Sequence, residues 1–182
     1  MANLRNSTES YGIIAQAFHW LVAVLVLAQL GIGLYAANLS EEWLSPHKSL
    51  GLAILALVLL WLGWRALNPP PELPGSMPRW QRGAALATHR LLYLLLILAP
   101  LAGWLYASAA GLSVSWFGLF QFPDLVSKDR ESADLFKALH IGLVALLASL
   151  VAVHVGAALR HWILLRDGVM HRMLPWKPRR ND

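Results

Sequence analysis

The chain contains 182 residues, of which 57% are hydrophobic and only 14% are charged, with a formal net charge of +5. Because a soluble domain carries roughly 25% charged residues, this composition excludes an ordinary soluble globule and predicts an integral membrane protein. The absence of cysteine excludes disulfides, thiolate zinc sites and cysteine-ligated iron–sulfur clusters. Histidine, of which the chain has seven, is therefore the one good transition-metal ligand present in several copies.

Four apolar segments are long enough to cross a hydrocarbon core, which takes about 20 helical residues. We expect these spans at approximately residues 12–37, 47–66, 84–108 and 137–162. Each must be helical, because an open strand would leave backbone groups unpaired in lipid. The first span has a longer apolar core than a signal peptide, so we expect it to stay in the protein. The sequence predicts one all-α domain over residues 1–182, an integral membrane four-helix bundle.

The connections between the spans differ in composition. Residues 68–75 contain four prolines, which cannot continue a helix, so this segment is expected to be an extended loop at the membrane surface. Residues 111–134 form the longest connection. Its aromatic stretch, residues 116–120, suits a belt at the membrane–water interface.

The basic residues indicate how the chain is oriented. The N-terminus, the loop after the second span and the C-terminal tail hold eleven of them: Arg5, Arg65, Arg79, Arg82, Arg90, Arg160, Arg166, Arg172, Lys177, Arg179 and Arg180. The other two connections carry four basic and six acidic residues, a net charge of −2. The positive-inside rule therefore predicts that both termini are cytoplasmic. Anionic lipid headgroups account for the basic pI near 10.0, so no nucleic-acid partner is expected.

Five histidines fall within or at the end of a span, where an ionisable residue suggests a functional site. His140 and His154 are 14 residues apart on the fourth span, which places them on one helix face about 21 Å apart in depth. His47 has the depth to meet His140 at the outer level. His19 and His89 both have the depth to meet His154 at the inner level, and spacing does not decide between them.

Two stacked sites, each with one histidine from each of two helices, match the bis-imidazole ligation of haem iron. Gly51, Gly142 and Gly156 lie near these histidines and could leave room for a macrocycle or serve close helix packing. Structural histidines that bond neighbouring helices are the alternative. A zinc or copper transporter is disfavoured, since no Asp or Glu lies inside a span.

Short motifs surround these histidines in a characteristic order. They are His19-Trp20, His47-x-x-x-Gly51, His89-Arg-Leu-Leu-Tyr93, Pro100-Leu-Ala-Gly103-Trp104 and the His140 to His154 pair. Their order and spacing resemble the bacterial cytochrome b561 family of di-haem membrane proteins, which is related to the cytochrome b subunits of nickel–iron hydrogenases and formate dehydrogenases. The resemblance covers roughly Tyr11 to Trp176.

This resemblance implies an electron carrier of the bacterial cytoplasmic membrane with two non-covalent b haems. By the family pattern His19 and His154 hold the inner haem, and His47 and His140 hold the outer one. His89 would then be free to act near a cytoplasmic quinone site. Arg90 suits a haem propionate or a quinone, although it could simply extend its charge to the headgroups.

The family members that this sequence resembles most are superoxide oxidases, which pass electrons from periplasmic superoxide to ubiquinone. Lys48 and Lys137 lie beside the expected outer haem and could guide an anion such as superoxide. The net acidic outer connections argue against this substrate, and both lysines could instead end helices or bind propionates. The alternative functions are a cytochrome b subunit or conduit for a separate soluble redox partner, and a haem-free protein with structural histidines.

Overall fold

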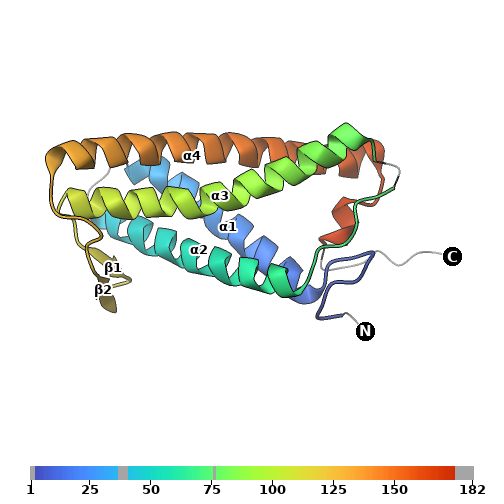
Figure 1. Cartoon of the computed structure of the whole chain (residues 1–182), viewed down its shortest axis with the longest axis horizontal. Coiled ribbons are helices and arrows are strands. Elements are labelled where there is room, and N and C mark those ends of the chain that lie inside the picture. The colour runs from blue at the N-terminus through green and yellow to red at the C-terminus, as the bar shows by residue number, and fades with distance from the viewer. Residues whose placement is uncertain (1–2, 37–40, 76, 175–182) are drawn as a thin grey trace.

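A computed structural model describes residues 3–36, 41–75 and 77–174 of the chain. Four long helices run along the length of the molecule: α1 (Ile13–Ala36), α2 (Glu41–Leu67), α3 (Arg79–Ala109) and α4 (Arg130–Leu159) (Figure 1). All four are long and apolar enough to span a membrane. The predicted all-α membrane four-helix bundle is therefore confirmed.

The helices are arranged as two close pairs, α1 with α2 and α3 with α4, and α2 joins the pairs by packing on α3. A small core lies where they meet, and Val58 at its centre is fully buried. Many large apolar side chains on the outside of the bundle are exposed. This inside-out distribution is expected for helices whose outer faces contact lipid tails.

Three helices begin earlier than the expected spans. Helix α2 begins at Glu41, α3 at Arg79 and α4 at Arg130, five to seven residues before the expected starts. Apolar content marks the part of a helix that lies in hydrocarbon, whereas the helix itself extends through its charged first turns. The carboxylate of Asp129 caps α4 by accepting from the Ser132 N–H at 2.8 Å. Hydrogen bonding to the side chain of Ser132, and secondarily to this N–H, lowers the pKa of Asp129 below its ordinary value.

A β-hairpin adds strands that the all-α expectation did not include. Strand β1 (Val114–Trp116) pairs antiparallel with β2 (Phe120–Phe122). Phe117 (47°) and Gly118 (73°) both have positive φ, and the Leu119 N–H donates to the Trp116 carbonyl oxygen at 2.9 Å, as in a type I′ turn. The fully buried Ser49 hydroxyl lies 3.0 Å from the Ser115 carbonyl oxygen and accepts from the Phe117 N–H at 3.0 Å. These bonds attach the hairpin to α2.

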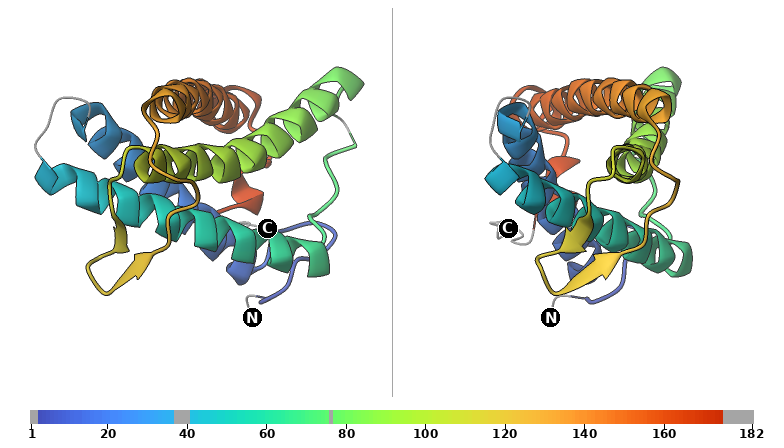
Figure 2. Two further views of the ribbon diagram at one scale, coloured as in Figure 1. Left: turned by 60° about the vertical axis from the view of Figure 1, so that its left-hand side comes forward. Right: turned by 90° about the vertical axis from the view of Figure 1, so that its left-hand side faces the viewer.

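The segments at the two ends of the described chain both lie at the opposite end of the bundle (Figures 1 and 2). Asn6 Nδ2 donates to the carbonyl oxygen of Asn68 at 3.0 Å, and Trp20 Nε1 donates to that of Met173 at 2.9 Å. Beyond α4 the chain continues as a π-helical turn, η1 (Arg160–Leu165), and a short 3₁₀ helix, η2 (Met170–Arg172). We refer to this end as the terminal end and to the other as the hairpin end.

Candidate functional site

The hairpin-end pair consists of His47 on α2 and His140 on α4, whose ring centres are 6.2 Å apart with nearly perpendicular planes. Nδ1 of His140 lies 2.8 Å from the carbonyl oxygen of Ala99 on α3 and must donate to it. This bond fixes the tautomer and leaves Nε2 free to bind a metal. One turn further along α3, Gly103 leaves the space that the His140 ring occupies. A Cβ atom there would lie 3.1 Å from two ring atoms.

The His47 ring lies against α1 at two residues one turn apart. Gly33 makes room for it, because a Cβ atom there would lie 3.3 Å from Cε1 of His47. Gln29 donates from Nε2 to the carbonyl oxygen of His47 at 2.9 Å, and the same nitrogen lies 3.4 Å from Nε2 of the ring. Our sequence-based site omitted Gln29. The signal that could have identified it is an amide deep within a mostly apolar span, where a polar side chain is costly without a role.

The terminal-end pair consists of His19 on α1 and His154 on α4, with ring centres again 6.2 Å apart. His89 on α3 lies on the other side of His154, with a ring-centre distance of 5.2 Å. Nδ1 of His89 lies 2.7 Å from the carbonyl oxygen of Ala85 on its own helix. The structure thus places three of the predicted histidines together at one depth.

An aromatic group surrounds the terminal-end pair and was absent from the sequence-based site. The rings of Trp61 and His19 are 6.2 Å apart, and those of Trp61 and Tyr93 are 5.2 Å apart, both in edge-on contact. The guanidinium of Arg65 lies 5.4 Å from the centre of the Tyr93 ring. These contacts join α1, α2 and α3 around the pair. The helical repeat of the sequence alone could not show which aromatic residues face the inside of the bundle.

The geometry of both pairs can be compared with that of a bound metal. Imidazole nitrogens bind transition metals at about 2 Å, so two rings bound in line to one iron have centres about 6.4 Å apart. The separations of 6.2 Å in the His47–His140 and His19–His154 pairs match this spacing. The 5.2 Å between His89 and His154 is too short for it. Within the described segments, no group of three or more His, Asp or Glu side chains could hold a metal ion.

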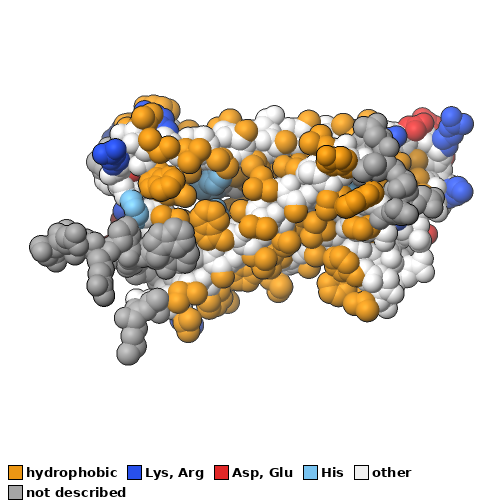
Figure 3. All heavy atoms as spheres, turned by 180° about the vertical axis from the view of Figure 1, so that it is seen from behind, with side chains coloured by type: hydrophobic (Ala, Val, Ile, Leu, Met, Phe, Trp, Pro, Cys, Tyr) orange, Lys and Arg blue, Asp and Glu red, His pale blue; other side chains and the backbone are white. Residues whose placement is uncertain are grey.

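Unsatisfied buried nitrogens are a second sign that a group belongs between the rings. Nδ1 of His19 and Nδ1 of His47 are buried without a hydrogen-bond partner, which is uncommon and costly in a folded protein. Helices α1 and α4 are not a close-packed pair. Figure 3 shows the molecule hollowed on this side, with a histidine side chain visible in the hollow. The residues present therefore fit two haems held by paired histidines.

The predicted basic residues lie at the edges of these sites. Lys48 donates from Nζ to the carbonyl oxygen of Ser113 at 2.5 Å, which ties it to the start of the hairpin segment. Lys137 is exposed one turn before His140, and Arg90 is exposed beside His89. None of these three side chains is placed between the rings of a pair.

None of the three glycines that the sequence suggested lies against a histidine ring, so their role in leaving room for a macrocycle stays a prediction. A Cβ atom added at Gly142 or Gly156 would meet no atom of the described chain within 4 Å. Each follows its histidine by two residues, which is about 200° around the helix. A Cβ atom at Gly51 would lie 3.3 Å from Nε2 of Gln29. The glycines that accommodate the rings are Gly33 and Gly103.

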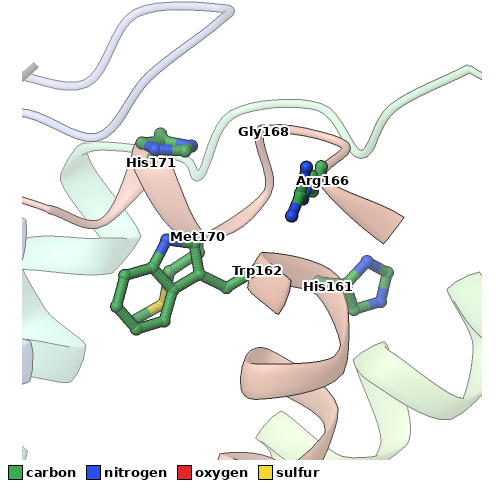
Figure 4. Close-up of a pocket in the computed structure, with 6 residues that line it drawn as sticks. All are labelled: His161, Trp162, Arg166, Gly168, Met170 and His171. Carbon is green, nitrogen blue, oxygen red and sulfur yellow. The ribbon is translucent and has the colours of Figure 1, made fainter. Parts of the chain in front are cut away.

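A cavity of about 250 Å³ lies at the terminal end, where α4 passes into η1 and η2 (Figure 4). It is lined by His161, Trp162, Arg166, Gly168, Met170 and His171. Nδ1 of His161 lies 2.5 Å from the carboxylate of Asp167. Burial raises the pKa of Asp167, but the hydrogen bonds from His161 and the Val169 N–H outweigh this effect and lower it overall.

Comparison with known proteins identifies the family. The model of the prokaryotic cytochrome b561 family matches residues 10–176. The chain belongs to this family. It is 36% identical over 176 residues to cytochrome b561 homolog 2 of Escherichia coli, an alignment that covers 93% of each chain. It is 30% identical to the probable superoxide oxidase CybB of Yersinia pestis, over 93% of this chain and 98% of that one.

A third relative, cytochrome b561 homolog 1 of Escherichia coli, is 30% identical over 86% of this chain and 92% of its own length. The family resemblance inferred from the sequence motifs is therefore confirmed. Membership implies b-type haem, membrane electron transfer and a multi-pass protein of the bacterial inner membrane.

Proposed function

We propose that this cytochrome b561 binds two b haems, one between His47 and His140 and one between His19 and His154, and transfers electrons across the inner membrane. The observation that carries this proposal is that the two rings of each pair have centres 6.2 Å apart. In both pairs, one histidine belongs to α4. His140 and His154 are 14 residues apart, about 21 Å along that helix. Two sites at two depths would divide the membrane crossing into short steps.

The four histidines would hold the haems, which would supply one-electron chemistry when bound. The protein residues supply orientation. Ala99 and Gly103 hold the His140 ring, while Gln29 and Gly33 hold His47 at its side. The apolar helices and the lipid around them would limit the access of water to both pairs, and solvent access is one of the means by which a protein sets haem potential.

The positive-inside rule supports an orientation with the hairpin end in the periplasm and the terminal end in the cytoplasm. Electrons that enter at the hairpin end would then leave at the terminal end, where ubiquinone in the inner leaflet could accept them. Two positions there are candidates for the quinone ring. One is beside His89, and the other is the cavity of Figure 4, whose Trp162 and Met170 offer apolar surface beside the donors of His161 and Arg166.

Substitution of His89 distinguishes these two positions. We expect His89→Ala to retain both haems and to lower the rate of ubiquinone reduction by roughly a hundredfold or more, the size typical of losing a proton-transferring group. His161→Ala in the cavity is the matched variant. Stopped-flow oxidation of the reduced protein by a short-chain ubiquinone measures both. Unchanged quinone reduction in His89→Ala, together with a loss in His161→Ala, would contradict the role of His89.

We further propose that superoxide is the electron donor, with Lys48 and Lys137 guiding the anion to the hairpin-end haem. The relative named as a probable superoxide oxidase supports this donor. Lys137 supports it as well, because its exposed charge lies one turn from His140. The hydrogen bond from Lys48 to Ser113 leaves Lys137 as the more accessible cation.

Reversing the charge of Lys137 tests this donor. We expect Lys137→Glu to slow haem reduction by superoxide roughly two- to tenfold at low ionic strength, because a like charge repels the anion. Salt should reduce the difference. Arg130→Glu, two turns earlier on α4, is the control and should have a smaller effect. If superoxide reduces no haem of the wild-type protein beyond the dismutation background, a soluble redox partner would be the donor instead.

A further inference from the structure

The hairpin exposes an uncharged apolar tip. The exposed fractions of its side chains are 56% for Phe117, 75% for Leu119 and 50% for Phe120. No Asp, Glu, Lys or Arg occurs between residues 112 and 123. Large apolar side chains gathered on a charge-free tip are unusual on a surface that faces water.

The other side of the hairpin is already occupied by the bundle. Val114 is 2% exposed and packs with Leu52 of α2 and Ala107 of α3. Trp116 and Phe122 pack against the same cluster. The exposed tip is therefore a second, separate face of the hairpin, and nothing within the described chain is available to cover it.

The direction of the hairpin indicates what covers this face. It projects sideways past α2 and not along the bundle (Figure 1), and in the view along the bundle it lies outside the helices (Figure 2, right). A sideways projection at the end of a membrane-spanning bundle points along the bilayer surface. Tyr35 at the end of α1 and Trp43 at the start of α2 are also exposed at this end, by 67% and 47%.

We propose that Phe117, Leu119 and Phe120 insert into the interfacial layer of the leaflet at the hairpin end and anchor the bundle there. Aromatic side chains favour this layer, because it accepts both their apolar and their polar parts. A protein partner fits less well, since a stable protein interface uses about 20–30 residues a side, far more than this tip provides.

The anchor would also set the depth of the hairpin-end pair. Ser49 holds the hairpin through Ser115 and Phe117 and lies two residues after His47 on α2. A hairpin fixed in the interface therefore fixes the start of α2. This inference does not depend on the haem assignment, because it concerns only the position of the hairpin relative to lipid.

The absence of cysteine in the chain allows a site-specific test. The test variant is Leu119→Cys, and the control on the same connection is Ser127→Cys. Each is labelled with an environment-sensitive nitrobenzoxadiazole and placed in phosphatidylcholine nanodiscs, one copy per disc. We expect emission from position 119 at shorter wavelength than from position 127. It should be quenched by lipid carrying a nitroxide at acyl carbon 5 and protected from iodide. Position 127 should show the opposite pattern.

Equal emission and equal iodide quenching at the two positions would overturn the proposal. A shift at position 119 that occurs only in discs with two copies would also overturn it, because a second copy would then cover the tip. Circular dichroism verifies that each labelled chain is helical. If Leu119→Cys does not fold, Gln121→Cys on the exposed side of β2 replaces it, with the same expected result.

Discussion

His140→Ala is expected to remove the haem at the hairpin end and to leave one haem per chain. The orientation of the His140 ring is fixed, because its Nδ1 is hydrogen-bonded to the carbonyl oxygen of Ala99, and its Nε2 remains available to bind iron. Alanine offers no ligand, and His47 alone would have to hold the haem through a single imidazole. Haem extraction and quantification of the purified variant, with low-temperature optical spectra to distinguish the two centres, measure the loss.

His154→Ala is expected to remove the other haem and to preserve the one at the hairpin end. The two pairs share no histidine and lie about 21 Å apart along α4, so each site should empty independently. His171→Ala, a histidine outside both pairs, is the control and should keep two haems. Loss of both haems in each variant, with the control intact, would show that the sites are not independent and would leave the pairing unsupported.

Gly103→Val is expected to empty the hairpin-end site without changing any ligand. A Cβ atom at this position would lie 3.1 Å from Cε1 and Nδ1 of His140, and the bond to Ala99 keeps the ring from moving away. The larger valine would therefore displace the ring from its place opposite His47. We expect one haem per chain, or a markedly altered spectrum of that centre, by the same extraction and spectra.

Gly63→Val provides the matched control for this variant. Gly63 is an exposed helical glycine with no neighbouring atom of the described chain within 4 Å of an added Cβ. Both substitutions change helix propensity by the same amount, so only steric contact with the histidine differs. Two haems with unchanged spectra in Gly103→Val would contradict the seating of His140 on α3.

The sequence predicted the features that depend on lipid and on helical repeat. Apolar length indicated four spanning helices, and a separation of 14 residues placed His140 and His154 on one face. The structure brings His47 near His140 and His19 near His154, each at 6.2 Å. Their service as iron ligands stays a prediction.

Features that depend on contacts between helices could not be predicted from the sequence. Depth alone could not separate His19 from His89, since only the packing of α3 places His89 closer to His154. The hairpin depends on Ser49, which bonds Ser115, 66 residues later in the chain, and such long-range pairing leaves no local pattern. Gly33 and Gln29 likewise matter only because α1 packs on α2 at His47.

In the proposed function, paired histidines hold two b haems in each chain. The most direct measurement is a pyridine haemochrome assay on the intact purified protein, combined with amino-acid analysis to count chains. We predict two haems per chain, both extractable into acidified organic solvent, because no cysteine is present to bind them covalently. One haem per chain, or none, in fully folded protein would contradict the account.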